Sequence, residues 1–161
     1  MFISAIGQDS HRFEPEGSQK PLTLGGVVIP NALGLSGNSD ADVILHAVTN
    51  AVSGITGVNI LGKISDGLCL NNGITDSRVY LQKALETLGD WKITHLSISV
   101  EAKKPHLSKH IPLIKESLSS LLSLSENSVG LTATTGEGLT GFGRGEGIQA
   151  LVIVSAVKAV S

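Results

Sequence analysis

The sequence predicts a mixed α/β fold of the α+β sandwich type, in which a sheet of about four main strands carries its helices on one face. Residues 92–101 alternate apolar and polar side chains like a half-exposed strand, whereas residues 43–52 carry apolar side chains at helical spacing. The order strand, helix, strand over residues 92–135 predicts a parallel strand pair joined by a crossover. The 161 residues have the size of one domain, so we expect a single domain over 1–161.

Each element is bounded by residues that start or stop it. Ser39 and Asp42 precede the apolar run of the first helix, and Asp76 precedes that of the second. Several Gly and Asn residues over 58–73 predict a long loop. The expected elements are, in order, strands at 2–8 and 22–29 (broken by Gly25-Gly26), a helix from Asp42 to Gly54 or Gly57, a loop at 58–73, a helix from Asp76 to Gly89, a strand at 92–101, a helix at about 108–124, and strands at 128–135 and 147–158.

The composition excludes several classes of protein. A net charge of −2 leaves no broad basic face for duplex nucleic acid, and the few aromatic residues offer little stacking surface for single strands. No apolar run approaches the roughly 20 residues that span a bilayer. A single cysteine, Cys69, and a start unlike a signal peptide make the cytoplasm the expected location. The second face of the sheet mixes Ser and Thr with apolar residues, so we expect it to pack against sister subunits.

Three residues could form a metal site. Asp9 and His11 close the first strand, where alternation puts both side chains on one face. Asp42 and His46 lie four residues apart on the predicted helix, where His46 could face the strand. One carboxylate and two imidazoles would leave the fourth tetrahedral position of Zn²⁺ open for catalysis. The alternative is that His46 is a satisfied core residue, as lone histidines on apolar helices often are.

Two further segments could bind anions. Residues 133–147 combine six glycines with Thr, Arg and Glu, which leaves the backbone open to close approach by a phosphate, although a flexible hairpin is an equal alternative. Residues 103–110 form the one dense basic cluster, before a predicted helix start where backbone amides also favour anions. The alternative there is a solvated turn.

Together these motifs carry a specific likeness. The chain resembles the 2-C-methyl-D-erythritol 2,4-cyclodiphosphate synthase family over essentially its whole length. The resemblance rests on ordered short motifs, namely Ile6-Gly7-Gln8-Asp9-Ser10-His11-Arg12-Phe13, Leu24-Gly25-Gly26-Val27, Asn38-Ser39-Asp40-Ala41-Asp42-Val43-Ile44-Leu45-His46, Asp76-Ser77, His110-Ile111-Pro112, Ala133-Thr134-Thr135-Gly136-Glu137 and Gly143-Arg144-Gly145-Glu146-Gly147-Ile148.

The resemblance implies an enzyme of the non-mevalonate route to isoprenoid precursors, a phosphorus–oxygen lyase. Such an enzyme converts 4-diphosphocytidyl-2-C-methyl-D-erythritol 2-phosphate to the 2,4-cyclodiphosphate and CMP. It also implies a homotrimer whose sheets face a central axis and whose three active sites lie between subunits. A catalytically silent trimer that binds isoprenoid diphosphates in its central cavity is the alternative, which would have no reason to keep the metal-binding residues.

The metal ligands follow from the same resemblance. Asp9, His11 and His46 would hold a Zn²⁺ ion on the β-phosphate of the substrate. Glu137 would help to place Mg²⁺ or Mn²⁺ at the substrate diphosphate. Cations are needed because an anionic nucleophile attacks an anionic diphosphate, so positioning and electrostatics should dominate catalysis.

The resemblance also assigns the other site residues. Thr135 would bind and polarise the diphosphate, Ser39 would seat the 2-phosphate or the erythritol, and Asp42 would orient other groups or contact the sugar. Arg144 would lie toward the trimer axis. The remaining expected substrate contacts are Gly62, Asp66, Ala102, Lys104, His106, Leu107, Ala133 and Thr134.

The chain departs from the family pattern at several substrate contacts. Asn38 stands where the family usually has His, so it can donate a hydrogen bond to a phosphate but carries no charge. Ile60 stands where a carboxylate usually contacts the ribose, and Asp66 could replace another usual Asp. His106 aligns with a pocket Lys, for which Lys104 could substitute. Because the metal-binding residues are intact, we expect a divergent but active enzyme.

Overall fold

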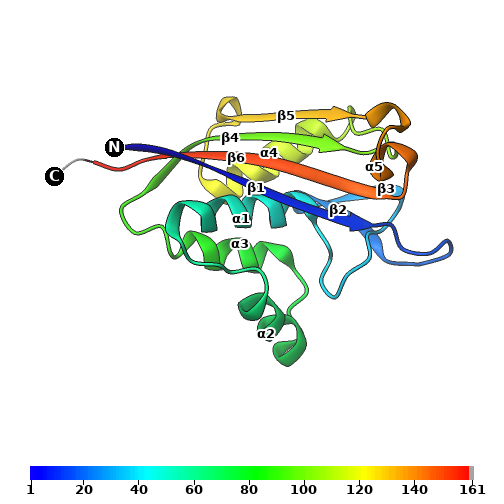
Figure 1. Cartoon of the computed structure of the whole chain (residues 1–161), viewed down its shortest axis with the longest axis horizontal. Helices are drawn as coiled ribbons and strands as arrows, with labels where there is room; N and C mark the ends of the chain where they lie inside the picture. Colours follow the sequence, from blue (N-terminus) through cyan, green and yellow to red (C-terminus); the bar gives the residue numbers. More distant parts are fainter. Residues whose placement is uncertain (160–161) are drawn as a thin grey trace.

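The computed structural model describes residues 1–159, and its central feature is a four-stranded mixed sheet (Figure 1). The order of the strands is β1 (Phe2–Arg12), β6 (Gly147–Val157), β4 (Lys92–Glu101) and β5 (Val129–Thr134). The first and last strands of the chain pair along their whole length, because β1 and β6 are antiparallel from Phe2↔Val157 to Arg12↔Gly147. The strands β4 and β5 pair in parallel, which confirms the predicted parallel pair.

Helices cover one face of this sheet. Helix α1 (Val43–Thr56) packs against β1 and β6, and α4 (Ile111–Leu122) packs against β5. Helix α3 (Ser77–Leu85) lies on α1, and α2 (Lys63–Asn72) protrudes from the body below them in the view of Figure 1. A separate hairpin of β2 (Pro21–Leu24) and β3 (Val27–Leu33) turns at Gly25-Gly26, both with positive φ.

The strand β1 approaches α1 closely at Gly7. A Cβ atom at this position would overlap the carbonyl oxygen of Ala47 and lie 2.5 Å from the amide nitrogen of Ala51. Only glycine therefore fits, and the backbones of strand and helix meet there. Two residues farther along the same face of β1 comes Asp9, so this contact sets the distance between the strand and the helix at the candidate site.

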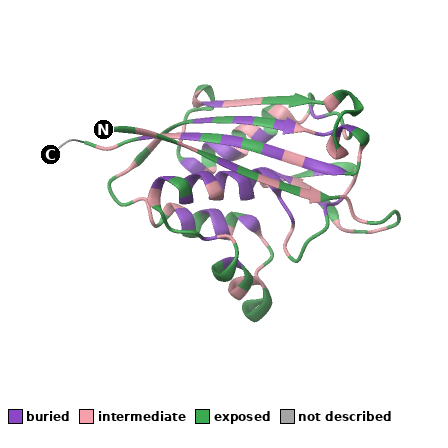
Figure 2. Cartoon of the chain, viewed as in Figure 1, coloured by how far each residue is buried: buried purple, intermediate pink, exposed green. Residues whose placement is uncertain are grey.

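The two faces of the sheet differ in burial, as the alternating colours along β1 and β6 show (Figure 2). Toward the helices, the strands bury an apolar set that includes Leu96, Ile98, Ile148, Val152 and Val154. On the opposite face of the sheet, a row of large apolar side chains is exposed. The row consists of Phe2, Ile6, Leu151, Ile153 and Val157, and its two most exposed members, Phe2 and Ile6, are each 67% exposed.

Several predicted boundaries were wrong. Residues 58–73 are not a loop, because α2 forms within them after Gly62, where Ser65 and the Gly62 backbone exchange capping hydrogen bonds. The Gly-rich segment also contains the 3₁₀ turn η2 (Gly136–Gly138) and the short helix α5 (Gly141–Arg144), which Thr140 caps. A second 3₁₀ turn, η1 (Glu126–Ser128), precedes β5.

Other elements differ only in length. The first strand continues to Arg12 because its whole length pairs with β6. The second strand is two short strands, and α4 begins at Ile111 rather than 108, with Pro112 in its first turn. Among residues 1–159, no helix has the length and apolarity needed to cross a membrane.

Candidate metal centre and substrate pockets

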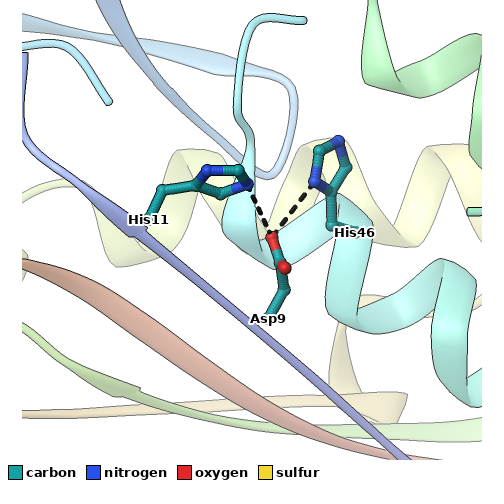
Figure 3. A group of neighbouring side chains, drawn as sticks. All are labelled: Asp9, His11 and His46. Carbon is teal, nitrogen blue, oxygen red and sulfur yellow. Dashed lines mark hydrogen bonds and ion pairs between the residues drawn. The ribbon is translucent and has the colours of Figure 1, made fainter. Parts of the chain in front are cut away.

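Three side chains from β1 and α1 converge on one point (Figure 3). The Oδ2 atom of Asp9 lies 3.1 Å from Nε2 of His11 and 3.1 Å from Nδ1 of His46. The three donor atoms all lie within 4.8 Å of one another. Asp9 and His11 share the helix-facing side of β1, as predicted, and His46 faces them from the first turn of α1. The sequence prediction that these three residues gather is confirmed.

The hydrogen bond that His11 makes on the side away from Asp9 leaves its inner nitrogen, the one that faces Asp9, without a proton in the neutral ring. The Nδ1 atom of His11 lies 2.8 Å from the carbonyl oxygen of Ser36, which can only accept, so Nδ1 carries the proton. The inner Nε2 of His11 is buried and has no hydrogen-bond partner among residues 1–159. Lone pairs of imidazole and carboxylate therefore face each other, an arrangement that a cation stabilises. The donor set fits a Zn²⁺ ion.

The pKa values of His11 and Asp9 also indicate that this site stabilises positive charge. Contact with Asp9 raises the pKa of the His11 imidazole, and burial opposes this shift only partly. Burial raises the pKa of the Asp9 carboxyl, but its contacts with the two histidines outweigh burial and hold the pKa below its usual value. The site thus keeps its carboxylate ionised and favours a cation beside it.

A pocket of about 330 Å³ opens onto these ligands. Besides the three candidate ligands, its walls come from the loop before α1, from α2 and the two residues before it, and from Tyr80 of α3. Predicted site residues among them are Asn38, Ser39, Gly62 and Asp66, and residues that the sequence did not predict are Gly37, Leu61, Ser65, Cys69 and Tyr80. Most of this wall was not predicted, because the pattern of residues 58–73 predicts a loop in place of α2.

A second pocket, of about 180 Å³, lies where β4 and β5 end and α4 begins. The two parallel strands end side by side, so the loops after Glu101 and Thr134 meet at one edge of the sheet. Six of the nine lining residues are predicted site residues, namely Ala102, His106, Leu107, Ala133, Thr134 and Thr135. The two pockets share no lining residue, so the predicted catalytic residues Asn38 and Thr135 lie in different pockets of the same chain.

Comparison with known proteins identifies the family. The model of the YgbB family matches residues 2–157. The chain belongs to the YgbB family. A relative from Chlamydia muridarum, named 2-C-methyl-D-erythritol 2,4-cyclodiphosphate synthase, is 44% identical over 159 residues, which cover 98% of this chain and 89% of the relative. This family membership confirms the resemblance that the sequence motifs indicate.

Solved structures of the same enzyme class share the fold of this YgbB-family chain. A CDP-bound 2C-methyl-D-erythritol-2,4-cyclodiphosphate synthase is 31% identical, with a TM-score of 0.79 over 96% of this chain and 100% of the other. The bifunctional IspDF from Campylobacter jejuni gives a TM-score of 0.88 at 28% identity. The match covers 99% of this chain but only 43% of that longer protein.

Four predicted residues of this YgbB-family member do not line either pocket. Asp42 is completely buried and lines neither pocket. Its carboxylate accepts hydrogen bonds from the backbone amides of Gly25, Gly26 and Leu45. It caps α1 and ties that helix to the β2–β3 turn. Lys104, Glu137 and Arg144 are exposed, and Arg144 pairs with Glu146.

The burial of Asp42 predicts an unusual pH dependence of stability. Burial raises its pKa to about 6, against the opposing effect of the three backbone amides. The folded protein therefore holds a proton between pH 4 and 6 that the unfolded chain releases. The contribution of this group to the free energy of unfolding is greatest below pH 4 and falls by about 3 kcal/mol as the pH rises through 6.

Urea unfolding of the wild type and of Asp42→Asn at pH 4, 5, 6 and 7 checks this. The stability of the wild type relative to the variant should fall by about 2.4 kcal/mol over that range, because the amide does not titrate. A difference that is constant with pH would contradict the raised pKa.

Proposed function

We propose that this chain is a 2-C-methyl-D-erythritol 2,4-cyclodiphosphate synthase. Its substrate would be 4-diphosphocytidyl-2-C-methyl-D-erythritol 2-phosphate. An oxygen of the 2-phosphate attacks the β-phosphorus, the bond from that phosphorus to the bridging oxygen breaks, and CMP leaves with the bridging oxygen. The reaction class is phosphorus–oxygen lyase. The observation that carries the proposal is the convergence of Asp9, His11 and His46 at the wall of a pocket, in a chain that belongs to the YgbB family.

The metal-binding residues would supply the electrophilic half of the site. Asp9, His11 and His46 would hold Zn²⁺, and Glu137 would help to hold Mg²⁺ or Mn²⁺. Bound divalent cations neutralise phosphoryl oxygens and draw electrons from the phosphorus that is attacked. The chain itself contributes the rigid spacing of the ligands, since two of them stand on a strand and the third on a helix that meets that strand at Gly7.

The polar residues around the pocket would hold the two phosphate ends in line. Asn38 and Ser39 lie at the wall beside the metal ligands and can donate hydrogen bonds to the 2-phosphate. Thr135 lies at the second pocket, whose small, partly apolar wall suits a cytosine base. Because the attack is intramolecular, fixing both ends of the substrate supplies much of the rate.

A homotrimer would complete each site. The two pockets of one chain are lined by separate sets of residues, which supports an active site that joins the first pocket of one subunit to the second pocket of its neighbour. The exposed apolar row on the open face of the sheet, from Phe2 and Ile6 to Ile153, supports an arrangement in which three sheets pack about a central axis. Arg144 would lie toward this axis.

The departures from the family pattern would act on substrate affinity more than on the chemical step. Asn38 lacks the charge of the usual His, and Ile60 lacks the carboxylate expected on the ribose. Ile60 is 3% exposed and so belongs to the core, whereas Asp66 is exposed at the pocket wall and can contact a ligand. Lys104 is exposed and outside the second pocket, two residues before His106 in the chain, and would have to reach toward the pocket to replace the usual Lys.

The direct test is conversion of the substrate by the purified protein. With Mg²⁺ or Mn²⁺ added, we expect stoichiometric release of CMP and formation of the cyclodiphosphate, both followed by ³¹P NMR. A chelator should stop the reaction, and Zn²⁺ together with Mg²⁺ should restore it. Binding of CDP without turnover would refute the activity while leaving the nucleotide pocket intact.

A further inference from the structure

A chain of hydrogen bonds runs behind His46, on the side away from Asp9. The outer Nε2 atom of His46 lies 2.8 Å from the hydroxyl oxygen of Ser77, the first residue of α3. That hydroxyl donates a short hydrogen bond to Oδ1 of Asp40. The second oxygen of Asp40 accepts from the backbone amide of Ser77, at 3.1 Å. Ser77 is completely buried and His46 is 8% exposed, so little water reaches these groups.

The position of each proton in this series of hydrogen bonds follows from which groups can donate and which can only accept. An ionised carboxylate can only accept, so the single proton of the Ser77 hydroxyl points to Asp40. The Ser77 oxygen must then accept from His46, which requires the His46 proton to be on Nε2. In the neutral imidazole, which is the form that binds a metal, the Nδ1 atom, 3.1 Å from Asp9, is then left with a lone pair that faces the candidate metal position.

We propose that Asp40 and Ser77 are positioning residues that lock His46 in the tautomer and ring orientation required for binding a divalent cation. The inference rests on the metal centre of the proposed function. Without the hydroxyl, the buried Nε2 has no partner, and the imidazole can rotate or move its proton to Nδ1. Outer hydrogen bonds of this kind typically change metal affinity by about 10-fold to 100-fold.

The same groups connect the metal centre to the pocket wall. Asp40 also accepts from the amide of Asp42, at 3.2 Å, and its own amide donates to Thr75, at 2.8 Å. It follows directly on Asn38 and Ser39, which line the pocket. The Asp40 carboxylate thus binds the first residue of α3 and the residue before α1, and it acts on His46 through Ser77. A shift of this loop would move the pocket wall and His46 together.

The test measures zinc affinity of the full-length chain by competition with a chromophoric chelator. Ser77→Ala should bind Zn²⁺ about 10-fold to 100-fold more weakly than the wild type, and Ser77→Thr, which keeps the hydroxyl, should lose much less. Asp40→Asn should weaken binding to a similar extent, since an amide can donate to Ser77 and so reverse the proton order. Asp76→Ala is the matched control, because Asp76 caps the same helix through the amide of Arg78 without contacting His46.

A second measurement reads the tautomer directly. In metal-free protein labelled with ¹⁵N-histidine, the His46 signals, assigned by their loss in His46→Ala, should show the proton on Nε2 in the wild type and a mixture of tautomers in Ser77→Ala. A wild-type proton on Nδ1, equal zinc affinity of Ser77→Ala and the wild type, or an equal loss in Asp76→Ala would each overturn the inference. If the wild type bound no zinc at all, the metal centre of the proposed function would be wrong as well. If the wild type binds zinc and one of the other contrary results is found, only the positioning role of Asp40 and Ser77 is wrong.

Discussion

Replacing His46 with alanine is expected to lower the rate of cyclodiphosphate formation by at least about a thousandfold. The substitution removes one of three ligands and leaves Asp9 and His11 as an incomplete site. Loss of the cation removes several kcal/mol of charge stabilisation from the transition state, and each 1.4 kcal/mol is about tenfold in rate. Steady-state release of CMP and metal content after dialysis measure the two effects.

The control for this prediction is a histidine outside the candidate site. His95 is exposed on β4 and lines neither pocket, so His95→Ala should retain near-normal turnover. The His46 variant should still assemble as the wild type does in sedimentation, since the side chain lies on the helix-facing side of the sheet and not on its open face. An unchanged rate in His46→Ala would remove this residue from the metal site.

Replacing Gly7 with alanine is expected to destabilise the fold by about 3 kcal/mol or more and to weaken zinc binding at the same time. The added methyl group would overlap the backbone of α1 at Ala47, where no flexible side chain can move aside. Relief requires α1 to move away from β1. That movement separates Asp9 and His11, on the strand, from His46, on the helix.

A second strand glycine provides the matched control. An added Cβ atom at Gly130 of β5 would have a single neighbour within 4 Å, at an ordinary contact distance of 3.9 Å. Gly130→Ala should therefore change the free energy of unfolding by no more than about 1 kcal/mol and leave zinc affinity unchanged. Urea unfolding and chelator competition measure both variants. Equal stability of Gly7→Ala and Gly130→Ala would contradict the close approach of β1 and α1.

The candidate metal ligands were predictable because their geometry is mostly local. Asp9 and His11 are two residues apart on one strand, so alternation alone puts them on the same face. The contact between that face and His46 needs only the burial of an apolar helix against the sheet. The role of Asp42 was not predictable in the same way. Its spacing from His46 suggested a site residue, whereas its carboxylate accepts hydrogen bonds from three backbone amides, two of which belong to the distant Gly25-Gly26 turn.

The prediction of a loop at residues 58–73 was wrong for a related reason. Its glycines and asparagines favour a loop on local propensity, and α2 has only one buried residue, Ser65. Capping at Gly62, and contacts made by its partly buried residues with the rest of the core, allow a helix there. The pocket wall that includes Cys69 was missed along with it.

The sequence by itself determined the strand and helix periodicities, the three candidate metal ligands and the family, since these depend on local spacing and on short motifs. The tertiary structure alone decided that Gly7 sets the distance between β1 and α1, that Asp42 is buried as a cap, and that Asp40 and Ser77 stand behind His46. The physical reason is that hydrogen-bond partners and close backbone contacts join residues 16 to 40 positions apart in the chain, such as Asp42 and Gly26 or Gly7 and Ala47, and no local pattern specifies such pairs.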